Sequence, residues 1–77
     1  MSVVGLSEKE ARLRGLIEHW AHHNDEHRDR FLEAASEAEG LGLRESAAEM
    51  KLAADKADEV SRHLRKALER LGGRLNV

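Results

Sequence analysis

Two apolar heptad patterns, separated by one glycine-containing interruption, constrain the fold of this chain more than any other feature of its sequence. They consist of Leu13, Ile17, Trp20, Asn24, His27, Phe31, Ala34, Ala38, and then Leu43, Ala47, Met50, Ala54, Ala57, Ser61, Leu64, Leu68, Leu71. Both advance by alternating steps of four and three residues, which is the period of one face of an α-helix. None of the 77 residues is proline, so no residue forces a break within either pattern.

The interruption is Gly40-Leu41-Gly42, and we expect Gly40 to take the left-handed conformation that ends many helices. A capping box of Ser7 and Glu10 marks the start of the first helix. A connection this short makes the two helices antiparallel. The sequence therefore predicts an all-α fold with one domain over residues 1–77. This domain is an antiparallel two-helix hairpin, with helices over about 7–39 and 43–71 and a turn at 40–42.

In such a hairpin, residue i of the first helix faces a residue near 81 − i of the second. Trp20 is then expected against Ala57 and Ser61, and His27 against Ala54. Further apolar residues lie beside both patterns: Leu16, Ala21, Ala35, Ala53, Val60 and Ala67. They widen the apolar stripe beyond what one partner helix covers. We therefore expect a homodimer that forms a four-helix bundle, with a different protein partner as the other way to cover this surface.

Composition excludes several classes of function. Thirteen basic and fifteen acidic residues give a net charge of −2, which predicts no nucleic-acid partner. The apolar runs are too short to cross a membrane, and the first six residues do not resemble a signal peptide. With no cysteine in the chain, we expect a cytoplasmic protein. No phosphate-binding loop or nucleophile with an oxyanion hole is recognisable, so we expect a protein that is not an enzyme.

A histidine cluster in the first helix is the one feature that suggests specific chemistry. Four of the five histidines fall between His19 and His27. His19, His23 and His27 recur every four residues and so form one row along the helix, about 5–6 Å apart at Cβ. We predict that His23 and His27 chelate a transition metal (Ni, Zn, Cu or Fe). Further ligands can come from His19, from Asp58 or Asp55 across the hairpin, or from a second copy of the chain.

The same residues also admit a structural interpretation. His27 lies in the heptad pattern and can be a hydrogen-bonded histidine of the bundle, while Asn24 can be a buried polar residue that fixes register. In that case the chain is a structural or protein-interaction module without a ligand. If a metal binds, Trp20 and Asn24 are expected to hold its ligands in position without binding the metal themselves.

The stretch His19-Trp20-x-x-His23-Asn24-x-x-His27, with Phe31 and the glycine-leucine turn after it, resembles a group of small bacterial and archaeal helical-hairpin domains. The resemblance covers roughly residues 13–71 and implies that His19, Trp20, His23, Asn24 and His27 act together. It also implies an association with a small nickel-binding protein of carbon monoxide dehydrogenase maturation. It carries no activity over to this chain.

Overall fold

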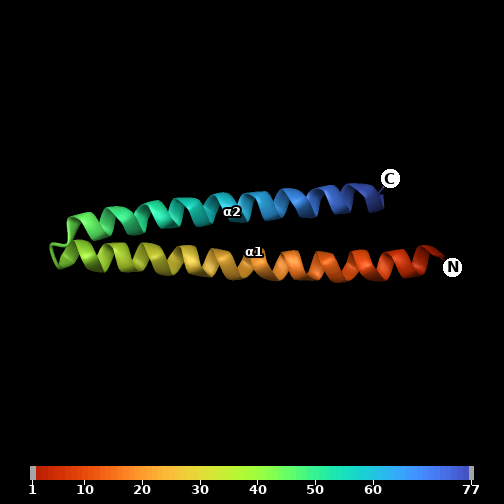
Figure 1. Cartoon of the computed structure of the whole chain (residues 1–77), viewed down its shortest axis with the longest axis horizontal. Helices are drawn as coiled ribbons and strands as arrows, with labels where there is room; N and C mark the ends of the chain where they lie inside the picture. Colours follow the sequence, from red (N-terminus) through yellow and green to blue (C-terminus); the bar gives the residue numbers. More distant parts are fainter. Residues whose placement is uncertain (1, 77) are drawn as a thin grey trace.

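The computed structural model is a two-helix hairpin, and it describes the backbone of residues 2–76 and the side chains of residues 8–71. Helix α1 spans Ser2–Gly40 and helix α2 spans Arg44–Asn76. The helices lie side by side in opposite directions, and both ends of the chain lie at the end away from the turn (Figure 1). The molecule is a rod of 62 × 16 × 12 Å. The prediction of an all-α hairpin is therefore confirmed.

The turn at Gly40-Leu41-Gly42 is closed by backbone hydrogen bonds that complete the last turn of α1. The amide of Leu43 donates to the carbonyl of Ala38 at 2.8 Å, and the amide of Gly42 donates to that of Glu39 at 3.0 Å. This pair of bonds is a Schellman motif, in which the residue after the helix takes a left-handed conformation. That residue is Gly42, with a φ of 80°, so the prediction that Gly40 would take this role is wrong.

Both helices extend further than the sequence predicted. Helix α1 begins at Ser2 instead of Ser7, so Ser7 lies within a helix and does not cap one. The side-chain contacts predicted for the capping box at Ser7 lie outside the described side chains. Helix α2 continues past Gly72 and Gly73 to Asn76. Each glycine costs a helix only about 1 kcal/mol relative to alanine, which weakens the helix but does not terminate it.

Small side chains fill the contact between the helices. The buried residues are Ile17, Ala21 and Ala35 on α1 and Ala47, Ala54, Ala57 and Ser61 on α2. On α2 these are members of the predicted heptad pattern. On α1 the contact keeps Ile17 of the predicted pattern but shifts from Trp20 to Ala21, because Ala21 is 2 % exposed whereas Trp20 is 49 % exposed.

The predicted placement of Trp20 against Ala57 and Ser61 is therefore wrong. Ala21 takes that place, and its carbonyl lies 3.4 Å from the Ser61 hydroxyl. Alanine and serine allow the two backbones to approach closely, and an indole between them would force the helices apart. The close packing of the hairpin thus leaves Trp20 on the outer surface of α1. Neither helix, over the residues that the structure describes, has an apolar stretch long enough to cross a membrane.

Candidate metal centre

A row of aromatic rings runs along α1, and its members are one helical turn apart. The rings of His19 and His23 stack with centroids 5.9 Å apart, and those of His23 and His27 meet edge-on at 4.5 Å. Phe31 continues the row, stacked 6.1 Å from His27. The sequence prediction that these histidines share one face of the helix is confirmed by this geometry.

His23 and His27 approach more closely than ring stacking requires. Their Nε2 atoms lie 3.0 Å apart, so one nitrogen donates a hydrogen bond to the other when both rings are neutral. The remaining nitrogen of His23, Nδ1, lies 3.7 Å from a carboxylate oxygen of Glu26. A histidine whose outer nitrogen faces a carboxylate is the arrangement that orients many metal ligands. Glu26 was not among the predicted site residues, although its position three residues after His23 is a signal for such a contact.

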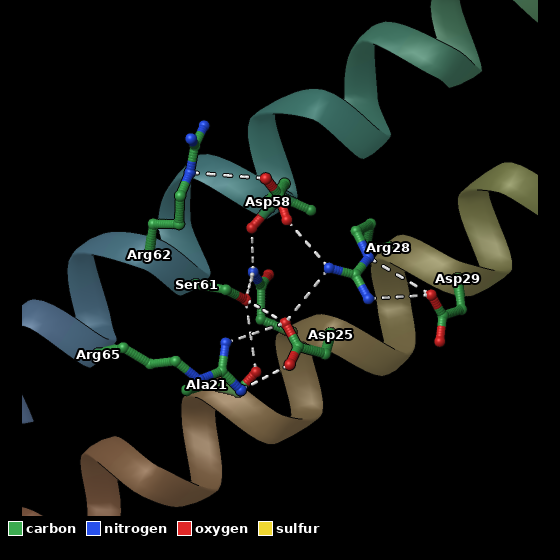
Figure 2. Close-up of polar contacts among 10 residues, drawn as sticks. Ala21, Asp25, Arg28, Asp29, Asp58, Ser61, Arg62 and Arg65 are labelled. Carbon is green, nitrogen blue, oxygen red and sulfur yellow. Dashed lines mark hydrogen bonds and ion pairs between the residues drawn. The ribbon is translucent and has the colours of Figure 1, made fainter.

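Asp58 does not join this pair. Its Oδ1 accepts a hydrogen bond from Arg28 Nη1 at 2.9 Å, and its Oδ2 lies 3.5 Å from Arg62 Nε. Figure 2 shows Asp58 and Arg28 pointing toward each other between the two helices. Within the described part of the chain, no three His, Cys, Asp or Glu side chains come together as a set of metal ligands.

Asp25 is the centre of a second polar cluster beside Arg28. Its Oδ1 accepts from the Ser61 hydroxyl at 2.6 Å, and its Oδ2 accepts from Arg65 Nη2 at 2.6 Å (Figure 2). The hydrogen bonds from Arg65 and Ser61 lower the pKa of the Asp25 carboxyl to about 2, against the opposing effect of partial burial. Asp25 was not predicted from the sequence, because nothing in the heptad pattern distinguishes it from the other charged residues of α1.

Asn24 binds the opposite helix and does not orient the histidines. Its Nδ2 donates to the carbonyl of Ala57 and, at 2.9 Å, to the Ser61 hydroxyl. Ser61 can therefore accept from Asn24 while it donates to Asp25. The interpretation of Asn24 as an interhelical polar residue agrees with these contacts, which fix the register of α1 on α2.

The two polar groups lie on opposite faces of the hairpin. We call the surface that holds Asp25, Arg28, Asp58 and Arg65 the ion-paired face. Val60 follows Asp58 by two positions, so it lies about 200° around α2 from Asp58. His27 follows Asp25 by two positions and lies about 200° around α1 from Asp25. The opposite surface, which we call the histidine face, therefore carries His23 and His27 with Leu13, Leu16, Trp20 and Val60. Each of these four apolar residues is nearly half exposed.

Substitution of Asp25 tests the ion-paired face. The folded pKa of Asp25 is below its ordinary value of 3.8, so its contribution to stability is present above about pH 4 and is lost as the pH falls toward 2. Because the side chain is 23 % exposed, we expect Asp25→Asn to lower the free energy of unfolding by about 1–2 kcal/mol at pH 7. The difference from wild type should shrink toward pH 2 in denaturant titrations.

Asp29→Asn is the matched control for that substitution, since Asp29 pairs with Arg28 at 3.2 Å but is 64 % exposed. An exposed pair of this kind contributes little, so its variant should stay within about 0.5 kcal/mol of wild type. Equal losses in the two variants would show that Asp25 is an ordinary surface charge.

Comparison with known proteins places the chain in a family. A protein of Archaeoglobus fulgidus named "Uncharacterized protein" is 43 % identical over 61 residues, which cover 79 % of this chain and 97 % of the relative. No solved structure matches the chain. A family model described as a domain of unknown function, DUF8180, matches residues 13–71 and so covers the turn and most of both helices. The chain belongs to the DUF8180 family.

Proposed function

We propose that this protein binds a divalent transition metal through Nε2 of His23 and Nε2 of His27, and that it is a binding protein without catalytic activity. The observation that carries the proposal is the 3.0 Å separation of these two nitrogens on an exposed surface. Two imidazoles one helical turn apart on a long helix are held by the backbone at a distance that a single ion can bridge.

The separation also favours particular metals. With metal–nitrogen distances of about 2.0–2.1 Å, two nitrogens 3.0 Å apart subtend roughly 90–100° at the ion. Angles near 90° suit square-planar or octahedral ions such as Ni(II) and Cu(II). A tetrahedral zinc ion would need the nitrogens to separate by a few tenths of an ångström. The resemblance described above implies an association with a nickel-binding protein, so nickel is the first metal to test.

Binding requires a rearrangement of protons that the site can accommodate. Without metal, the hydrogen bond between the two Nε2 atoms needs a proton on one of them. With metal, both Nε2 lone pairs are used, so each ring carries its proton on Nδ1. Glu26 lies near Nδ1 of His23 and favours that tautomer at one of the two ligands.

A second candidate function is a protein-interaction module in which the histidines form only their mutual hydrogen bond. It is favoured by the exposed apolar residues of the histidine face, Leu13, Leu16, Trp20 and Val60. The two functions differ in whether the protein binds a metal ion, because only the first uses the lone pairs of both imidazoles.

Calorimetric titration of the untagged protein with Ni²⁺ at about pH 7.5 separates the two candidates. Wild type should bind, and His23→Gln or His27→Gln should abolish binding. Glu26→Gln should weaken it by about tenfold, because it removes the carboxylate beside His23 Nδ1.

His22→Gln is the matched control, because His22 belongs to the same cluster but lies near Glu26 through its own Nε2 at 3.5 Å and is 76 % exposed. Its variant should bind nickel as wild type does. The proposal fails if wild type binds no metal, or if His22→Gln weakens binding as much as the other two histidine variants.

A further inference from the structure

We infer that two copies of the chain pair through their histidine faces about a twofold axis, and that this pairing places four imidazoles around one metal ion. The inference rests on the proposed function and adds the source of the remaining ligands. His23 and His27 of each copy would contribute equally, since a twofold axis relates identical surfaces.

The first observation is that the site within one chain is incomplete. His23 and His27 supply two nitrogens, and no third ligand joins them among the described side chains. Asp58, the carboxylate predicted to help, is held by Arg28 and Arg62 on the ion-paired face. Transition metals bound to proteins generally have at least four ligands, so one chain leaves half of the positions unfilled.

The second observation is the apolar surface that surrounds the histidine pair. Trp20 and Val60 are each 49 % exposed, and Leu16 is 43 % exposed. Trp20 lies one turn before His23 on α1, and Leu16 lies one turn before Trp20. A second copy seated on the histidines would cover this surface and remove its apolar side chains from water.

The third observation is that charge favours an antiparallel pairing with a second copy. The open end of the hairpin, residues 8–18 and 62–70, has seven basic and four acidic residues, whereas the turn end, residues 33–51, has five acidic and two basic ones. An antiparallel arrangement brings the basic end of each copy to the acidic end of the other, while a parallel one would bring like charges together.

The position of the histidines on α1 fits this arrangement. An antiparallel pairing centred between His23 and His27 places residue i of one α1 near residue 50 − i of the other. Leu16 then lies near the small Ala34 of the second copy, and Glu37 lies near Arg12. Large side chains thus meet small ones, and opposite charges meet at the margin.

The test uses Cu²⁺ as the probe with the full untagged chain. Native mass spectrometry should show a dimer that carries one copper ion, and the electron paramagnetic resonance spectrum should show coupling to four equivalent nitrogens. Trp20→Lys, which places a charge on the exposed histidine face, should yield mainly monomers and remove the four-nitrogen spectrum.

Leu32→Lys is the matched control, because Leu32 is 47 % exposed and lies one heptad after Asp25, on the side of the ion-paired face. Its variant should keep the copper-loaded dimer. Monomers that each bind one copper ion would overturn the pairing and leave the proposed metal binding intact, whereas a wild type that takes up no copper would overturn both. Equal disruption by Leu32→Lys and Trp20→Lys would show that the histidine face is not the contact.

Discussion

Ala21→Leu should destabilise the hairpin by about 2–3 kcal/mol, measured as the free energy of unfolding in denaturant titrations. Ala21 is 2 % exposed, and its carbonyl lies 3.4 Å from the Ser61 hydroxyl, so no space remains for a larger side chain. Leucine would push α2 away and lengthen the interhelical hydrogen bonds of Asn24 and Ser61. The added apolar volume does not offset this loss, because the facing side chains of α2 are alanines, which cannot change rotamer to make room for leucine.

Ala48→Leu is the matched control for this substitution, since Ala48 is an exposed alanine of α2. Its free energy of unfolding should stay within about 0.5 kcal/mol of wild type. A tolerated Ala21→Leu variant would show that α1 packs through Trp20, as the heptad pattern had predicted, and that the alanine contact is incorrect.

The sequence alone predicts the hairpin but not which stripe of α1 packs against α2. The heptad pattern predicted the hairpin and the buried residues of α2, which are Ala47, Ala54, Ala57 and Ser61. On α1, stripes through Trp20 and through Ala21 both have steps of four and three. Periodicity does not distinguish them, and the volume that fits against Ala57 and Ser61 decides between them.

The turn shows a similar limit. Gly40 and Gly42 are equally able to adopt a left-handed conformation, and the sequence does not say which one ends the helix. The choice depends on where the chain must reverse for α2 to contact α1. In the structure that residue is Gly42.

The candidate site was predictable where it depends on a single helix. A spacing of four residues fixes the row of His19, His23 and His27 without knowledge of the fold. Contacts between helices were harder to predict, because several acidic residues of α2 could have faced the histidines. The ion pair of Asp58 with Arg28 depends on the rotation of α1, which the sequence left open.

Metal should raise the melting temperature of the wild-type protein by mass action. Ni²⁺ at about a hundredfold excess over its dissociation constant adds about 2.7 kcal/mol if it binds only the folded chain. For a domain of 77 residues, this corresponds to a rise of roughly 10–20 °C. The rise should be larger at about pH 7.5 than at about pH 5.5, because protons compete with the metal for imidazole nitrogens.

The control measurements keep protein concentration fixed, because pairing of two copies makes the melting temperature depend on it. His22→Gln should retain nearly the whole rise, and His23→Gln or His27→Gln should remove it. A rise of equal size at both pH values would contradict binding through imidazoles.

Elemental analysis of untagged protein, loaded with nickel and then freed of unbound metal by gel filtration, tests metal binding by His23 and His27 most directly. We predict that wild type retains nickel in a fixed ratio to protein, and that a variant carrying both His23→Gln and His27→Gln retains none. A wild type without nickel, or a double variant that retains as much as wild type, would contradict a metal centre at these two histidines.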